Sequence, residues 1–167
     1  YVRGLVLSLN MIETNGFSAS LDYTFQIAKG SASDPQQARN AIAGGSLPEI
    51  QLTPLDWDQR NTVNMSLAYD RANWGISGIG QFGSGLPYTP LSTEDISSLV
   101  LNSGKKPLTW NVDLKGYFIS RDGLRLFIRA ENIFDRLNPY TVYDDSGVAD
   151  FTRWENIAKS QNTGEPI

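Results

Sequence analysis

Hydrophobic and polar residues alternate along much of the chain. The cleanest run covers residues 16–28, where apolar or aromatic side chains occupy every second position from Phe17 to Ile27 and Ser, Asp, Thr and Gln lie between them. Side chains of a β-strand switch faces at each residue, so this pattern predicts a strand with one apolar and one polar face. The same reasoning gives six extended segments: residues 1–12, 16–28, 57–69, 74–85, 108–119 and 123–136.

The last segment, GLRLFIRAENIFDR, illustrates the two faces. Its apolar face consists of aliphatic residues: Leu124, Leu126, Ile128 and Ala130. Its other face is mostly charged: Arg125, Phe127, Arg129 and Glu131. Taken alone, this segment fits two environments, because an apolar strand face packs equally well against the core of a soluble protein or against lipid.

The lengths of the segments and of their connections separate these two environments. The segments are about twelve residues long, roughly twice a usual strand, and a tilted strand needs about nine to eleven residues to cross a bilayer. Short connections at 13–15, 70–73 and 120–122 alternate with long ones at 29–56, at 86–107 and after 136, and Asn15-Gly16 and Asp122-Gly123 are hairpin signals. Outer-membrane barrels combine short periplasmic turns with long extracellular loops, whereas soluble sandwiches show no such alternation. The predicted fold class is therefore all-β: a fragment of an antiparallel transmembrane β-barrel with about six long strands.

Aromatic residues gather near both ends of these segments. Four lie beside the short turns: Phe17, Tyr69, Trp74 and Phe118. Four others lie toward the opposite ends: Trp57, Phe82, Trp110 and Phe134. Strands are rich in aromatic residues in general, but placement at the ends favours the two aromatic girdles of a membrane barrel.

Composition excludes several classes of function. The 167 residues include 40% hydrophobic and 19% charged residues, with a net charge of −4 and no basic cluster, so we expect no nucleic-acid partner. The chain has neither cysteine nor histidine, which removes thiolate and imidazole chemistry and the usual zinc sites. The glycine-rich GSGLP at residues 83–87 lacks the Lys-Ser/Thr of a phosphate loop. We therefore expect no enzyme, and no catalytic, cofactor-binding or metal-binding residues.

The long loops hold two candidate helices and two acidic clusters. We expect one helix with Asp34 at its N-cap and Gly44 at its end, and another over residues 93–101. Asp56 and Asp58 around Trp57 could bind a cation, but we favour carboxylates that are solvated or paired with Arg60. YDDSGVAD at residues 143–150 resembles a calcium loop but lacks its ligand spacing, so we favour a turn.

Charged residues on the polar faces of the last two segments are the candidate site. Arg125, Arg129 and Glu131 of residues 123–136, with Asp113 and Lys115 of residues 108–119, would face the lumen of a barrel. One role is charge pairing across neighbouring strands and against a plug domain, and the other is contact with an anionic substrate in transit. The first role is the one we favour.

Three motifs, in order along the chain, resemble TonB-dependent outer-membrane receptors. LDWDQRNTVNMSLAY at residues 55–69 is similar to the strand that follows a long surface loop in that family. QFGSGLPYTP at residues 81–90 is similar to the strand end and loop start one hairpin later, and RAENIFDRLNPYTVYDDSG at residues 129–147 to the penultimate strand and its surface loop. The ordered set covers essentially the whole chain.

The resemblance implies a barrel of about 22 strands, closed by an N-terminal plug domain and energised through the TonB protein. Such receptors import scarce large ligands of the siderophore, cobalamin or glycan type across the outer membrane of a Gram-negative-type bacterium. Residues 1–167 would be the C-terminal portion of the barrel, with the plug domain and the final strand outside the chain. The implied partners are outer-membrane lipid, the protein's own plug, TonB and an imported ligand of unknown identity, with no cofactor.

Two other functions fit the same pattern. A passive porin or structural outer-membrane barrel has the same hairpins but no plug. A soluble antiparallel β-domain would act as a binding module, and free solubility without detergent would identify it.

Overall fold

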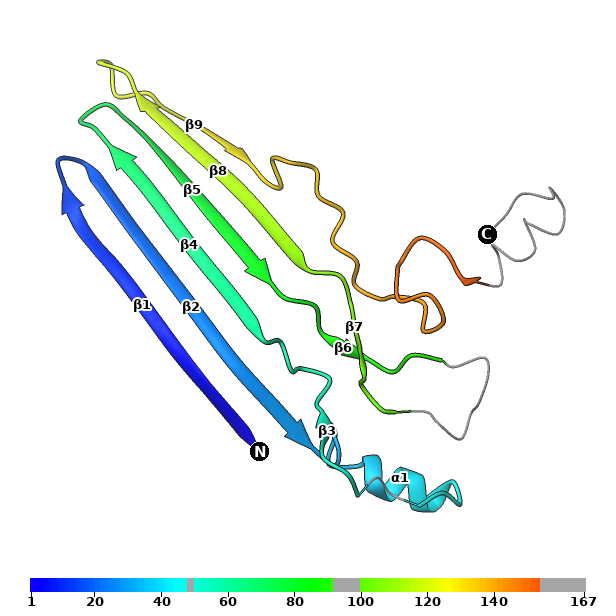
Figure 1. Ribbon diagram of the computed structural model, residues 1–167. Coiled ribbons are helices and arrows are strands. Elements are labelled where there is room, and N and C mark those ends of the chain that lie inside the picture. The colour runs from blue at the N-terminus through cyan, green and yellow to red at the C-terminus, as the bar shows by residue number, and fades with distance from the viewer. Residues whose placement is uncertain (48–49, 92–99, 154–167) are drawn as a thin grey trace, which may run out of the picture.

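The main feature of the computed structural model, which describes residues 1–47, 50–91 and 100–153, is one antiparallel sheet. Its long strands lie side by side in chain order (Figure 1). They are β1 (Val2–Thr14), β2 (Phe17–Gly30), β4 (Asn61–Asp70), β5 (Trp74–Gly83), β8 (Thr109–Ile119) and β9 (Arg125–Ala130). The predicted antiparallel β architecture is confirmed. Within the described ranges β1 and β9 form the two edges of an open sheet.

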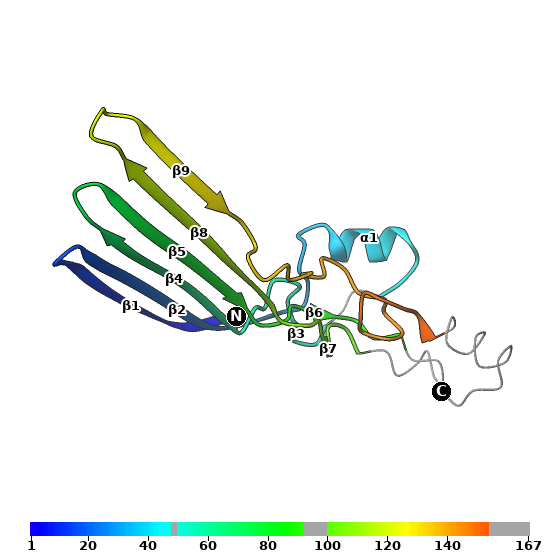
Figure 2. The same cartoon turned by 90° about the horizontal axis from the view of Figure 1, so that it is seen from above.

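Short elements lie outside the row of long strands, and among them β6 and β7 form a separate two-stranded sheet. β3 (Thr53–Pro54) pairs with the end of β2, β6 (Pro87–Tyr88) pairs with β7 (Gly104–Lys105), and the helix α1 spans Gln37–Ala43. All of them lie beyond the same end of the long strands (Figures 1 and 2). In the part of the chain that the structure describes, no helix has both the length and the apolar character that crossing a membrane requires.

The connections alternate as predicted. β1 and β2 are joined by Asn15 and Gly16 alone, whose φ values of 56° and 86° are those of the tight turn that the Asn-Gly pair predicts. Residues 71–73 join β4 to β5, residues 120–124 join β8 to β9, and these three turns lie at one end of the sheet (Figure 1). The described parts of the long connections, residues 31–47, 50–60, 84–91 and 100–108, lie at the other end (Figure 1).

Two strands are several residues shorter than predicted, whereas the other long strands differ by one or two residues at an end. β4 begins at Asn61 rather than at residue 57, because the side chain of Asp58 turns inward and holds the preceding backbone in a loop. β9 ends at Ala130 rather than at residue 136. Asn132 and Asp135 there have φ values of 50° and 49°, which an extended strand does not allow.

The first predicted helix is present but begins later than expected. α1 has Gln36 at its N-cap and ends before Gly44, as predicted for the C-terminus. The carboxylate of Asp34 accepts a hydrogen bond from the Gln36 N–H at 2.6 Å, so it closes the turn before the helix instead of capping the helix itself. The second predicted helix, residues 93–101, lies almost wholly outside the described residues.

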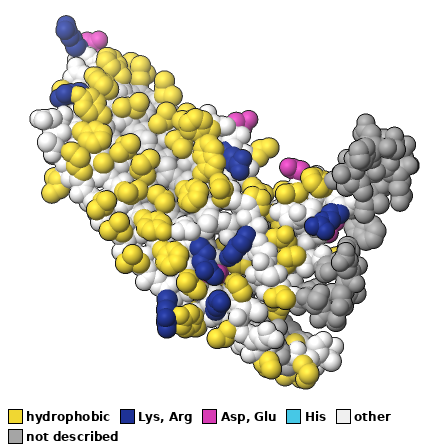
Figure 3. All heavy atoms as spheres, viewed as in Figure 1, with side chains coloured by type: hydrophobic (Ala, Val, Ile, Leu, Met, Phe, Trp, Pro, Cys, Tyr) yellow, Lys and Arg dark blue, Asp and Glu magenta, His cyan; other side chains and the backbone are white. Residues whose placement is uncertain are grey.

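The strand register joins the predicted apolar sides into a single face. Residues directly opposite one another in antiparallel strands share a face of the sheet. One such row crosses five strands through Leu9, Leu21, Met65, Gly80 and Val112. Figure 3 shows the result, in which hydrophobic side chains cover the face of the long strands.

This apolar face is exposed in the described chain. Large side chains along it that are exposed include Leu5, Leu7, Leu9, Met65, Leu67, Ile76, Leu114, Leu126 and Ile128. Among the described residues, the buried hydrophobic side chains are those of Ala28 and Leu55, near the long loops. Within residues 1–47, 50–91 and 100–153, the sheet therefore has no second layer that covers its apolar face.

Aromatic rings bound the apolar face at both ends. Near the short turns, Phe17 lies opposite Tyr69 and Trp74 lies opposite Phe118, with 5.6 Å between the ring centroids of Tyr69 and Trp74. These four residues form the first aromatic row, as predicted.

The second aromatic row lies toward the long loops. Phe82 is opposite Trp110, whose ring centroid is 5.4 Å from that of Phe134. From Trp74 to Phe82 and from Phe118 to Trp110 the chain runs eight residues, about 27 Å along a strand, or roughly 20 Å of depth at a tilt of about 40°. Trp57, also predicted for this row, lies in the loop before β4.

Candidate functional site on the polar face

The polar face of the sheet carries a continuous row of hydrogen-bonding side chains. Ser8 on β1 donates a hydrogen bond to the carboxylate of Asp22 on β2 at 2.6 Å. The register continues the row from Asp22 to Asn64 on β4, Gln81 on β5 and Asn111 on β8. Because all five residues are directly opposed in neighbouring strands, their polar groups lie on one side of the sheet.

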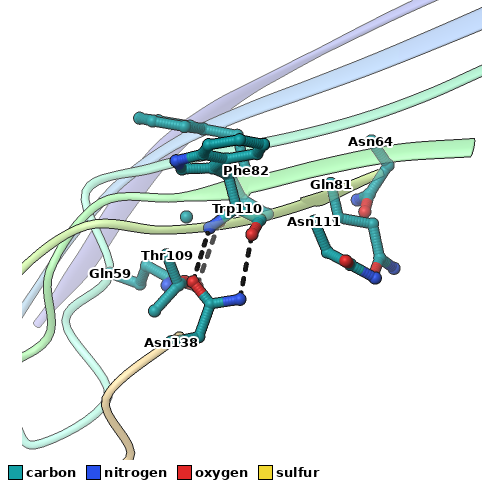
Figure 4. A pocket seen from close by; sticks show the side chains of 10 residues that line it. Gln59, Asn64, Gln81, Phe82, Thr109, Trp110, Asn111 and Asn138 are labelled. Carbon is teal, nitrogen blue, oxygen red and sulfur yellow. Dashed lines mark hydrogen bonds between the residues drawn. The ribbon is translucent and has the colours of Figure 1, made fainter. Parts of the chain in front are cut away.

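This row ends in a pocket of about 230 Å3 at the loop end of the sheet. Figure 4 shows its amide side chains, which come from β4, β5, β8 and the loops before and after them. The lining residues are Gln59, Thr62, Asn64, Gln81, Phe82, Gly83, Thr109, Trp110, Asn111 and Asn138. Most of these side chains are uncharged and polar, so the pocket is built for hydrogen bonds with a neutral group.

Asn138 lines the pocket, and its side-chain amide forms hydrogen bonds with the backbone of β8 of the kind that a neighbouring strand forms. Its Oδ1 accepts a hydrogen bond from the Trp110 N–H at 3.1 Å, and its Nδ2 donates to the Trp110 carbonyl at 2.9 Å (Figure 4). A side-chain amide thus satisfies the backbone of β8 at the level where β9 has already ended. The chain reaches this position through the turn at Asn132, whose side chain bonds both the N–H and the carbonyl of Arg136.

The side-chain amides that line the pocket differ in whether their nitrogen and oxygen atoms already have hydrogen-bond partners. The Gln59 side chain is engaged, because its Nε2 donates to the Ser84 carbonyl at 3.0 Å and its Oε1 accepts from Thr62 at 3.3 Å. Asn111 donates to Asp113 at 2.8 Å, but its buried Oδ1 has no hydrogen-bond partner in the described chain. Because this oxygen is buried, it is not open to the pocket, and the pocket's accessible amides are those of other side chains such as Asn64 and Gln81.

Asp58 fixes the loops behind the pocket. Its fully buried carboxylate accepts hydrogen bonds from the Ala28 N–H and from Arg60 Nε, both at 2.7 Å, and lies 3.6 Å from Lys105 Nζ. Burial acts to raise the pKa of this carboxyl, but the two hydrogen bonds and the charges of Arg60 and Lys105 outweigh burial and lower the pKa below its ordinary value. The charged carboxylate of Asp58 therefore links β2 to both long loops. Its predicted pairing with Arg60 is confirmed.

The structure brings three of the predicted site residues together. Lys115, Arg125 and Arg129 line one open hollow of about 600 Å3 on the polar face of the β8–β9 hairpin. Glu131 lies just past β9 and pairs with Arg129 at 2.8 Å. Asp113 lies toward the amide pocket, where it accepts hydrogen bonds from Asn111 and from the Asn132 N–H, both at 2.8 Å.

These contacts differ from the expected charge pairing across strands. Register places Lys115 directly opposite Arg129, so two cations face each other, and the ion pair of Arg129 joins it to Glu131 close by in the same stretch of chain. In the described part of the chain, neither Lys115 nor Arg125 belongs to an ion pair.

The other acidic clusters have structural partners. Asp56 accepts a hydrogen bond from Asn102 at 2.7 Å, which joins the two long loops. Asp145 accepts one from the Arg153 N–H at 2.8 Å, and Gly147 has a φ of 73°, as in a turn. No group of three His, Cys, Asp or Glu residues placed to hold a metal ion occurs within the described ranges.

Sequence reasoning missed the two asparagines that shape the pocket. Asn132 and Asn138 lie in a stretch that alternates weakly and was expected to be strand and loop. The available signal was the asparagine itself, since Asn is among the residues that most readily adopt positive φ and that satisfy nearby backbone groups with their side chains.

Comparison of the chain with protein-family models, with curated proteins and with solved structures gave no match. The family resemblance therefore rests on the three motifs given above, and function has to be argued from the two faces of the sheet.

Proposed function

We propose that the chain forms part of the wall of a TonB-dependent outer-membrane receptor. In this proposal the apolar face contacts lipid and the polar face lines the interior of a barrel that neighbouring strands complete. The receptor imports a scarce large ligand of the siderophore, cobalamin or glycan type, driven through TonB.

The observation that carries the proposal is the exposed apolar face between two aromatic rows. Leu5, Leu9 and Ile128 are 64%, 54% and 76% exposed on strands of the same sheet, and covering the exposed part of each would contribute a corresponding fraction of the roughly 1.5–3 kcal/mol that full burial provides. Soluble monomers rarely expose apolar patches beyond a few hundred Å2. A lipid bilayer covers such a face over its whole width.

The separation of the aromatic rows supports a bilayer rather than a second protein layer. The rows lie roughly 20 Å apart in depth for a tilted strand, which is close to the apolar band of about 25 Å in outer-membrane barrels. Strands of 10 to 14 residues, as in β2, β4 and β5, are long enough to cross that band. The core of a sandwich gives no reason for aromatic residues at both ends of such strands.

The polar face supports a receptor interior. A ligand in transit through a barrel needs hydrogen-bonding groups that are fixed in place, and the amide pocket offers the side chains of Asn64 and Gln81. The pocket lies at the end of the sheet where the long loops begin, which is the extracellular end in an outer-membrane barrel. The three family motifs add the TonB-dependent class to this picture.

The test uses the full-length protein, expressed in a Gram-negative host and located by membrane fractionation. We expect it in the outer membrane, extracted only by detergent, with gel migration that changes on heating. Its ligand uptake should stop when TonB is removed, whereas a passive porin would continue to conduct. Recovery of the folded protein in buffer without detergent would refute the proposal.

A further inference from the structure

We propose that the polar face of the β8–β9 hairpin is an anion site that binds a carboxylate or phosphate group of a ligand. The residues concerned are Lys115, Arg125 and Arg129, called the cationic triad below. This site is separate from the amide pocket, which offers uncharged groups only.

Register creates the site. Lys115 on β8 and Arg129 on β9 are directly opposed, so their Cβ atoms lie about 4.5–5.5 Å apart on the same face. Like charges at such positions destabilise a sheet. An anion held between the ammonium and guanidinium groups converts that repulsion into two charge-assisted hydrogen bonds.

The nearby acidic groups do not fill this role. Glu131 pairs with Arg129 from beyond the end of β9, and both side chains are more than 60% exposed, so that pair is weak. One carboxylate oxygen of Asp113 accepts hydrogen bonds from the Asn111 side chain and from the Asn132 N–H. The carboxylate of Asp70 accepts a hydrogen bond from the Tyr117 hydroxyl at 2.8 Å.

The positions of charged and aromatic side chains around the hollow indicate which class of ligand would fit it. Two cations lie at one end and Arg125 lies at the other, four residues along β9 from Arg129, or about 13 Å. Between them, Tyr117 and Phe127 are directly opposed, and Phe127 is 71% exposed. A simple anion such as malonate or phosphate would bind between Lys115 and Arg129, and an adjoining flat or apolar part of a larger ligand would lie along the two aromatic rings.

This inference deepens the proposed function, and it rests on that function only for the route by which a ligand arrives. If the protein proves soluble, the proposed function fails and anion binding can still be measured in buffer. If the protein inserts into membranes but the triad binds no anion, the inference alone fails.

The test measures thermal unfolding of the folded full-length protein while malonate or inorganic phosphate is titrated, with chloride at matched ionic strength as the reference. A ligand that binds only the folded state raises the unfolding temperature in a saturable way, which gives an apparent Kd. The variant is Lys115→Gln, and the matched control is Arg121→Gln in the exposed turn between β8 and β9.

We expect the Kd of malonate and phosphate to rise roughly tenfold or more in Lys115→Gln and in Arg129→Gln, because each loses a charged hydrogen-bond donor. Arg121→Gln should bind as the unaltered protein does. Without added anion, Lys115→Gln should unfold at the same or a higher temperature, since the repulsion from Arg129 is gone.

Two outcomes would overturn the inference. An equal response of all variants to malonate and phosphate would mean a general salt effect. A lower unfolding temperature for Lys115→Gln, with no response to either anion, would mean that an acidic segment of the protein itself occupies the triad.

Discussion

Replacement of Leu114 by arginine tests the lipid-facing role of the apolar face at its middle. Leu114 lies four residues from Trp110 and four from Phe118, midway between the two aromatic rows. Leu126, another residue of the apolar face, lies opposite Phe118 and so belongs to the level of the aromatic row near the short turns. Leu114 is therefore the sharper position.

The expected cost comes from the charge rather than from lost packing. Leu114 lies opposite Gly78 and Ala130, and its Cδ2 would be 3.1 Å from a Cβ on Gly78. The aliphatic stem of an arginine covers the same glycine. An arginine at the bilayer midplane of a barrel costs about 2–4 kcal/mol, whereas an exposed surface substitution in water costs within about 0.5 kcal/mol.

The measurement is urea unfolding of the full-length protein in lipid vesicles, and the matched control is Ser66→Arg on the polar face. Ser66 shares a 2.7 Å hydrogen bond with Ser20, so its replacement should cost only about 1 kcal/mol. We expect a loss of about 2–4 kcal/mol in the free energy of unfolding for Leu114→Arg. An equal or smaller loss than for Ser66→Arg would refute the assignment of the two faces.

Five further substitutions test local contacts and turns of the fold. Asp58→Asn should lower the free energy of unfolding by about 1–3 kcal/mol at neutral pH. Because the folded-state pKa of Asp58 is lowered, its carboxylate stabilises the folded protein above the ordinary value of 3.8, and this stabilisation is lost as pH falls through the folded-state pKa. The difference in free energy of unfolding between the unaltered protein and Asp58→Asn should therefore vanish in acid. A difference that does not depend on pH would contradict this. Asn132→Ala should increase hydrogen exchange at the Arg136 amide, while Asn132→Gly should keep the backbone turn but still lose both side-chain bonds. Gly16→Val should destabilise more than Gly123→Val in urea unfolding, because both have positive φ but only a Cβ at Gly16 would strike the neighbouring Asp70 carbonyl; equal effects would contradict the contact.

The strands and their faces could be predicted because apolar and polar residues alternate at every second position of the sequence. In β4, for example, Val63, Met65 and Leu67 alternate with Asn64 and Ser66, and nothing outside the strand is needed to assign the faces. Turn residues such as Asn15-Gly16 then fixed the hairpin, since few other residues adopt positive φ at both positions.

Features that depend on register or on distant loops could not be predicted in the same way. The opposition of Lys115 and Arg129 depends on the length of the turn between β8 and β9, and one residue more or less would change it. The burial of Asp58 depends on Ala28 and Lys105, which come from other parts of the chain. Local sequence pointed only to Arg60.

In the proposed receptor, one face of the sheet contacts lipid and the other face contacts water. Residues 1–167 contain no cysteine, so single cysteines at successive positions of β4, from residue 62 to residue 67, can carry spin labels in the full-length protein in vesicles once any cysteine elsewhere in it has been replaced. We predict that labels at Val63, Met65 and Leu67 are accessible to oxygen dissolved in lipid, and that labels at Asn64 and Ser66 are accessible to a water-soluble nickel chelate. Equal access of the nickel chelate to both sets, or shielding of the apolar set from both reagents, would contradict the account.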